Sequence, residues 1–176
     1  MEDKNAILEV TGIRKTFDGL RALDDVSFRV KKSHIKALIG PNGAGKTTLL
    51  NIINGLLPPD KGSVVLNGQE TVGMKTDRIA LLGLSRTFQL IRLFSVNEAT
   101  VLDNVLLGAH KHLKPSITGA VLFRRAFKKR ENAVREKAME MLRFVGMEHT
   151  ANMTPGSLSF GNQRMVELAR SLMSDP

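Results

Sequence analysis

The sequence predicts an α/β fold, and three observations support this. The first part of the chain alternates apolar and polar residues at period two, as half-buried strands do. A glycine-rich segment at 40–47 lies between a short apolar run and a helical pattern. From about Thr100 the apolar residues recur at helical spacing instead. The expected order is therefore a β-rich part, an α/β core, a helical part and one further helix.

Short strands and turns are expected in the first half of the chain. The segments that alternate, or that form short apolar runs, are 7–10, 26–30, 37–39, 64–66 and 85–88. The run 37–39 is typical of a strand that is buried on both faces. Turns are predicted at Gly12, Asp18-Gly19 and Asn67-Gly68.

Three helical segments are expected. The first begins near Gly45 and ends near Asn54, because Gly55 and Pro58-Pro59 follow it. In the second, one apolar face holds Phe123, Phe127, Val134, Ala138, Met141 and Val145, with Lys and Arg opposite. Met139, Met141 and Met147 are expected to fill its core. Pro155-Gly156 then breaks the chain, and a last helix is predicted over 162–173.

Composition narrows the class of protein. The 176 residues carry 26 Lys or Arg against 17 Asp or Glu, a formal charge of +9, and no cysteine. A disulfide framework and a cysteine-based zinc or redox site are therefore excluded. The N-terminus lacks a basic region followed by an apolar one, so we expect no signal peptide. The longest apolar run, about 79–84, is far shorter than the roughly 18 residues of a membrane helix.

Positive charge is concentrated between Lys111 and Arg143, where ten Lys or Arg face three Glu. The simplest interpretation is a solvated helix face, and the alternatives are contact with nucleic acid, anionic lipid or an acidic partner. Few aromatic residues accompany these charges, and no zinc-finger or RNP-type motif occurs. We therefore expect no direct binding of nucleic acid.

The strongest motif is a phosphate-binding loop. Its residues are Gly40, Pro41, Asn42, Gly43, Ala44, Gly45, Lys46 and Thr47. The glycines let consecutive backbone amides turn toward phosphate oxygens, and the following helix presents its positive end to them. Lys46 is expected to reach the β- and γ-phosphates, Thr47 to ligate Mg²⁺, and Thr48 to lie near the α-phosphate. A plain glycine-rich turn is the alternative.

This loop alone does not choose among the nucleotide-binding classes. The Asn-Lys-x-Asp tetrapeptide that reads guanine in GTPases does not occur in the sequence. Small-molecule kinases remain compatible with the loop.

A second motif, at 158–164, decides the class. It comprises Leu158 and Arg164 and, between them, Ser159, Phe160, Gly161, Asn162 and Gln163. It can be a capped helix N-terminus, with Ser159 accepting from backbone amides, or an anion site of the same geometry. Placed downstream of a phosphate loop and a helical insert, it resembles the signature motif of ATP-binding cassette (ABC) ATPases. That resemblance implies a dimer in which this motif contacts the ATP held by the other subunit.

Two more positions match the family. Phe17 resembles the aromatic residue that stacks on adenine. Gln89 resembles the glutamine that contacts Mg²⁺ and the attacking water, and that couples the site to the membrane partner. The resemblance therefore implies a catalytic and metal-binding role for Gln89.

A narrower resemblance exists as well. Residues 85–94 and 104–108 are similar to the ATP-binding subunits of branched-chain amino acid importers, and the aromatic Phe160 suits that branch. The general signature has Gly where Phe160 stands and Gln where Asn162 stands. Ser159 and Gly161, which are expected to contact phosphate, are kept.

The resemblance implies a P-loop NTPase core with an N-terminal antiparallel β subdomain and an α-helical subdomain. The expected parts are 1–94 (β-rich subdomain and P-loop core), 95–157 (helical subdomain) and 158–176 (signature motif and its helix). In the family, a hydrophobic strand with a Mg²⁺-binding aspartate and a catalytic glutamate comes next. Because the sequence ends at Pro176, before that strand, we expect little hydrolysis by the 176-residue chain itself.

The expected function is that of an importer's ATP-binding subunit, which couples ATP binding and hydrolysis to uptake of a solute such as a branched-chain amino acid. The implied cofactors are ATP and Mg²⁺. The implied partners are a second ABC ATPase subunit and transmembrane permease subunits at the cytoplasmic face of the membrane. Two alternatives stay open: a non-hydrolysing nucleotide-binding or interaction module, and a soluble ABC ATPase that acts on nucleic acid.

Overall fold

The computed structural model describes residues 6–87, 93–95, 98–112 and 124–176, and describes 110–112 and 124–127 by their backbone alone. The chain divides into two compact units, Met1–Leu84 and Ser85–Pro176. Each unit has its own apolar core. Within the described residues, no helix is both long enough and apolar enough to cross a bilayer.

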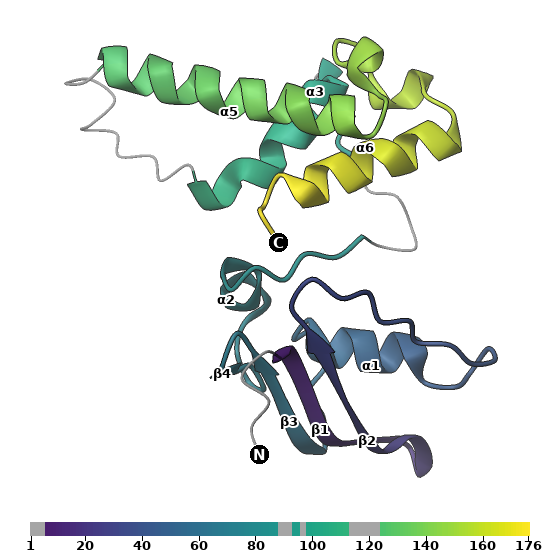
Figure 1. Cartoon of the computed structure of the whole chain (residues 1–176). Helices are drawn as coiled ribbons and strands as arrows, with labels where there is room; N and C mark the ends of the chain where they lie inside the picture. The colour runs from purple at the N-terminus through teal and green to yellow at the C-terminus, as the bar shows by residue number, and fades with distance from the viewer. Residues whose placement is uncertain (1–5, 88–92, 96–97, 113–123) are drawn as a thin grey trace. The chain divides into compact units, whose positions relative to one another are not determined.

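The first unit contains a four-stranded antiparallel sheet in the order β2-β1-β3-β4 (Figure 1). Its strands are β1 (Ala6–Phe17), β2 (Leu20–Lys31), β3 (Lys61–Leu66) and β4 (Gln69–Glu70). The turns at Asp18-Gly19 and Asn67-Gly68 have positive φ at both residues, as two-residue type I′ hairpins require. The expected antiparallel β part and both of these turns are therefore confirmed.

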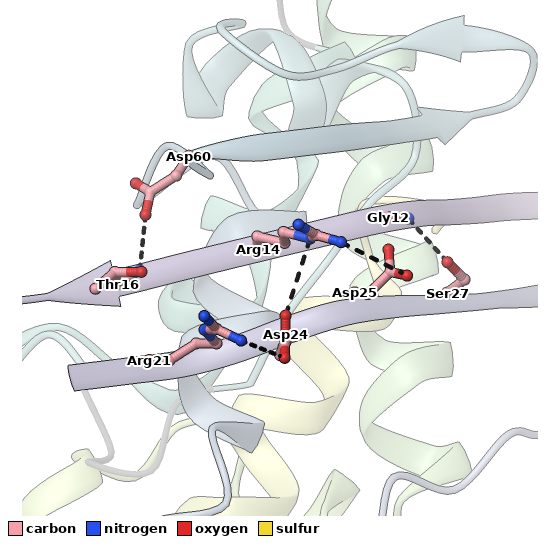
Figure 2. Close-up of polar contacts among 8 residues, drawn as sticks. All are labelled: Gly12, Arg14, Thr16, Arg21, Asp24, Asp25, Ser27 and Asp60. Atoms are coloured by element: carbon pink, nitrogen blue, oxygen red, sulfur yellow. Dashed lines mark hydrogen bonds and ion pairs between the residues drawn. The ribbon is translucent and has the colours of Figure 1, made fainter. Parts of the chain in front are cut away.

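Gly12 lies inside β1, so the turn predicted there is wrong. The pairing of β1 with β2 shifts register between Val10 and Ile13, and Gly12 has a φ of 63°. Glycine suits such a bulge because it adopts positive φ without steric strain. The Gly12 amide donates to Ser27 Oγ at 2.8 Å (Figure 2), which keeps the bulged strand attached to β2.

The buried strand predicted at 37–39 is also wrong. These residues have no regular structure and are exposed, with Ile39 at 89%. A strand exists only where a neighbour completes its hydrogen bonds. No described strand pairs with 37–39, so an apolar run alone does not produce a strand there.

Helix α1 (Lys46–Ile53) lies within one residue of its predicted limits. It ends in a Schellman motif, in which the Leu56 amide donates to Asn51 O and the Gly55 amide to Ile52 O, both at 2.9 Å. Gly55 has a φ of 70°, and a Cβ there would lie 2.5 Å from Ile79 Cδ1 on α2 (Thr76–Leu81). The core of this unit joins the sheet to α1 through Val10, Ile13, Leu23, Leu49, Ile52, Ile53 and Val64.

The second unit is helical. Its elements are α3 (Val101–Leu106), the 3₁₀ segment η2 (Leu107–His112), α5 (Arg124–Phe144), the short 3₁₀ turns η3 (Glu148–Thr150) and η4 (Pro155–Ser157), and α6 (Phe160–Leu172). The predicted apolar face of α5 is confirmed for Val134, Ala138, Met141 and Val145, and Met139 and Met147 also belong to the core. Phe123 and the side chain of Phe127 lie outside the described residues. Residues 85–87 are irregular, so the strand predicted over 85–88 is wrong for its described part.

Two close contacts organise this unit. The side chain of Asn104, fully buried, accepts from the Phe94 amide at 2.7 Å and donates to Phe94 O at 2.8 Å and Thr100 O at 2.9 Å. A Cβ on Gly108 would lie 2.2 Å from Arg170 O, so only glycine lets η2 approach α6 this closely. Asn104 and Gly108 belong to the segment 104–108, and Phe94 belongs to 85–94, the two segments that carried the narrower resemblance.

The hydrogen bonds of the Glu70 carboxylate should make the stability of the first unit sensitive to acid. It accepts from Ser63 Oγ and from the amides of Val64, Thr71 and Val72 at 3.0–3.1 Å. Partial burial alone would raise the pKa of Glu70, but these hydrogen bonds outweigh it and hold the pKa below its ordinary value. A lowered folded-state pKa contributes stability above the ordinary value of 4.5, and that contribution is lost as pH falls through the lowered pKa.

We expect Glu70→Gln to lower the free energy of unfolding at neutral pH by about 1 kcal/mol, the usual scale of an exposed hydrogen bond. It should also flatten the loss of stability below pH 4.5. Urea unfolding as a function of pH measures both effects. Asp77→Asn on α2 changes the formal charge equally and serves as the control; an equal flattening in both variants would contradict the assignment to Glu70.

Candidate functional site

The phosphate-binding motif forms an exposed loop that leads directly into α1. Residues 40–44 are exposed, and Gly45 is the N-cap of the helix. Gly43 and Gly45 have φ values of 82° and 80°, in the left-handed region that glycine adopts without strain. The first amides of an α-helix have no intrahelical acceptor, so this helix start can bind an anion.

Gly45 is tightly enclosed by β2. A Cβ there would lie 2.5 Å from Ala22 O and 2.8 Å from Leu23 Cδ2, whereas a Cβ on Gly43 would meet nothing within 4 Å. The last glycine of the motif is thus required by packing as well as by its backbone conformation.

Lys46 lies with its ammonium group inside the loop. Its Nζ donates to Gly40 O at 2.7 Å and to Pro41 O at 2.6 Å. The side chain therefore closes the loop on itself and keeps a positive charge at its centre. Thr47 is exposed and Thr48 half-buried on the first turn of α1.

Phe17 lies at the end of β1, 42% exposed, with Lys15 Nζ 5.6 Å from the centre of its ring. Lys15 pairs in register with Leu23, the residue that encloses Gly45, and lies two positions from Phe17. The aromatic ring is thus on the hairpin that borders the glycine loop.

Asp60 holds this end of β1 in place. It accepts from Lys15 Nζ at 2.8 Å. It also accepts from the Thr16 amide at 2.7 Å, a contact drawn in Figure 2. These two hydrogen bonds keep the pKa of Asp60 below its ordinary value, and the one from Lys15 has the larger effect. Figure 2 also shows Arg14 between Asp24 and Asp25, each 3.9 Å away.

The second motif begins α6. Ser159 is the N-cap, and its hydroxyl accepts from the Asn162 amide at 3.3 Å. Gln163 Nε2 donates to Pro155 O and Leu158 O, both at 3.1 Å, and so fixes the chain that enters the helix. A Cβ on Gly161 would meet nothing within 4 Å, so the space beside this helix start is open. The capped helix N-terminus expected from the sequence is confirmed.

Phe160 begins a series of side-chain contacts along α6 that continues through Arg164 to Glu167. These contacts were not predicted from the sequence. The ring of Phe160 is 67% exposed and lies 5.4 Å from the guanidinium of Arg164. Arg164 Nη1 in turn lies 3.0 Å from Glu167 Oε2, a carboxylate only 2% exposed. Burial lowers the pKa of Arg170, and the nearby charge of Glu167 opposes that shift. Spacings of four and three residues along a helix are the signal that could have predicted these contacts.

The predicted metal ligand Gln89, the metal-binding side chains and the cleft of the second unit complete the description of the predicted site. Gln89 lies outside the described residues. The described part of the chain holds no cluster of three or more metal-binding side chains. A cleft of about 520 Å³ in the second unit is lined by Arg86, Glu167 and Arg170 among others, and none of the predicted site residues that the structure describes is among its lining residues.

Known proteins are similar to this chain in sequence and in fold. A family model described as ABC transporter matches residues 23–176. The chain is 38% identical over 170 residues to the high-affinity branched-chain amino acid transport ATP-binding protein BraF of Pseudomonas aeruginosa. The match covers 97% of this chain and 66% of BraF, so the chain spans about two thirds of that relative.

Solved structures agree. The ATP-binding cassette MJ1267 in its ADP conformation matches with a TM-score of 0.78 and 34% identity, over 97% of this chain and 66% of that one. The dimeric cassette MJ0796 matches with a TM-score of 0.74 and 28% identity, over 96% and 70%. The chain belongs to the ABC transporter family of ATP-binding cassettes, whose members bind nucleotide.

The two loop glycines make a matched pair of variants. Gly43→Ala places a side chain at positive φ in open space, and we expect a loss of about 1–2 kcal/mol in the free energy of unfolding. Gly45→Ala adds a clash with the β2 backbone, so we expect a loss of more than about 3 kcal/mol. Thermal or denaturant unfolding compares the two; equal losses would show that the contact with β2 is unimportant.

Proposed function

We propose that the protein that carries this sequence is the ATP-binding subunit of an importer, and that it hydrolyses ATP to drive uptake of branched-chain amino acids. The glycine loop that starts α1 carries this proposal, because it combines exposed left-handed glycines, a helix N-terminus and an inward Lys46. The substrate class rests on the relative BraF, whose name states branched-chain amino acid transport.

The described residues fit the phosphates of ATP. The loop is exposed, and Lys46 Nζ already lies within 2.7 Å of two carbonyl oxygens, where phosphate oxygens could replace them as acceptors. We assign the phosphates to the loop residues Gly40, Pro41, Asn42, Gly43, Ala44, Gly45, Lys46, Thr47 and Thr48. We assign the adenine to Phe17, which presents an exposed ring on the bordering hairpin.

Mg²⁺ would be held by the hydroxyl of Thr47 and by Gln89. The Thr47 side chain is exposed on the first turn of α1, which agrees with such a role. When bound, the ion would neutralise charge on the phosphates. Lys46 and the first amides of α1 would orient the nucleotide beside it.

The start of α6 would contact ATP held by a second subunit. Ser159 and Gly161 leave an open, capped helix N-terminus, and an anion is favoured at such a position. Phe160, Asn162 and Gln163 complete the motif. The solved cassette MJ0796 is described as dimeric, which supports this assignment.

The partners would be a like or unlike ATPase subunit and transmembrane permease subunits, with the protein at the cytoplasmic face of the cell membrane. The name of BraF favours this reading over a non-hydrolysing module and over a soluble ATPase that acts on nucleic acid.

Lys46→Ala tests the nucleotide site. We expect at least about tenfold weaker binding of fluorescent ATP, because hydrogen bonds to charged groups contribute about 1.5–3 kcal/mol each. The chain has no Trp or Tyr, so a fluorescent nucleotide can be followed without interference from them. Lys36→Ala is the matched control, since Lys36 Nζ also donates to a backbone carbonyl, Arg29 O at 3.0 Å, outside the motif.

Unchanged ATP binding by Lys46→Ala would overturn the assignment. The substrate class is tested in the source organism, where Lys46→Ala in the complete gene should abolish uptake of leucine but leave uptake of lysine intact. Loss of both, or of neither, would contradict the branched-chain assignment while leaving the nucleotide site in place.

Ser159 separates the capping role from the binding role. Ser159→Ala removes the cap and should lower the free energy of unfolding by about 1 kcal/mol. Ser159→Asp keeps the cap but places a carboxylate where the partner's phosphates would lie. We expect it to unfold like the wild type and to abolish ATP-dependent dimerisation, measured by analytical ultracentrifugation. Dimerisation that persists in Ser159→Asp would refute the contact.

A further inference from the structure

The two halves of α5 differ in whether their basic residues lie near acidic side chains. In the second half each basic residue has an acidic neighbour. Arg143 Nη2 lies 2.7 Å from Glu148 Oε1, and Lys137 Nζ lies 2.5 Å from Asp175 Oδ1. Hydrogen bonds from Thr100 lower the pKa of Asp103, and the charge of Arg135 lowers it further. This half also carries all of the helix's described core residues, which begin at Val134.

The first half, residues 124–133, is here called the basic arm. It holds five Lys or Arg and one Glu, a net charge of +4 in ten residues. Every residue whose side chain is described there, 128–133, is exposed. Lys128, Lys129 and Arg130 make no ion pair or hydrogen bond with any described residue.

The spacing of these charges is unfavourable for the helix itself. Arg124 lies four residues before Lys128, and Arg125 four residues before Lys129. Like charges at this spacing destabilise a helix, and the described residues of the arm make no core contact that would compensate. An anion from outside the chain would relieve this repulsion.

We propose that the basic arm binds an anionic phospholipid surface. Clusters of four to eight Lys or Arg on one helix are typical of such binding. Lys128, Lys129 and Arg130 are consecutive, so they point about 100° apart around the helix. Long flexible side chains can turn toward a flat layer of headgroups from these positions, whereas one groove of a protein would meet only some of them.

Nucleic acid fits the arm less well. The chain has no Trp or Tyr, and 5% of its residues are aromatic, so the base stacking that accompanies single-strand binding has little support. The proposal does not depend on ATP binding, because no residue of the loop or of the α6 motif belongs to the arm.

The test is cosedimentation of the chain with phosphatidylcholine vesicles that contain or lack phosphatidylglycerol. We expect binding only to the anionic vesicles, and its loss at high salt. The triple variant Lys128→Gln, Lys129→Gln, Arg130→Gln should bind at least about tenfold more weakly, because each basic residue near such a surface contributes to the attraction.

The control variant is Lys32→Gln, Lys61→Gln, Lys75→Gln, three exposed lysines of the first unit. Both triple variants lower the formal charge from +9 to +6, so net charge alone cannot separate them. Circular dichroism checks that both stay folded. Equal loss of binding in both variants, or no binding by the wild type, would overturn the proposal. Arm-dependent binding of polyglutamate or RNA without vesicle binding would also overturn it, and would assign the arm to another class of partner.

Discussion

The arrangement of the first unit depends on one close contact, that of Gly45 with the carbonyl of Ala22 on β2. Glycine has no Cβ, and this lets the start of the helix lie directly against the sheet. That contact fixes the axis of α1, so Leu49, Ile52 and Ile53 reach the core between helix and sheet. The exposed loop and the inward position of Lys46 follow from the same placement, since both lie immediately before or at the first turn.

In the second unit the start of a helix is also held in place, but by side-chain hydrogen bonds and not by a close backbone contact. Its helix start, at α6, is set by side chains: the Ser159 hydroxyl caps the first turn, and Gln163 fixes the entering backbone. Arg164 then contacts both the exposed ring of Phe160 and the buried carboxylate of Glu167, so the ring is connected to the interior of the unit. Each unit thus has a core of its own and carries one of the two predicted motifs at the start of a helix.

Much of this was predictable because its signals are local. The limits of α1 follow from Gly45 and Gly55, the α6 cap from Ser159, and the β1–β2 turn from Asp18-Gly19. The irregular conformation of 37–39 was not predictable, because a strand forms only with a pairing partner that is often far away in the sequence. No described strand pairs with these residues. The Lys15–Asp60 contact joins residues 45 positions apart, so no local pattern could indicate it.

Gly55 has a further consequence for the loop at the opposite end of α1. A hydrogen at that position allows Ile79 and the Met74 carbonyl to press against the end of the helix, just as Gly45 allows β2 to press against its start. These contacts at both ends restrain α1 from sliding along its axis, and they restrain the amides of its first turn as well. These amides are therefore preorganised, and an anion bound by them would cost little conformational entropy in positioning them.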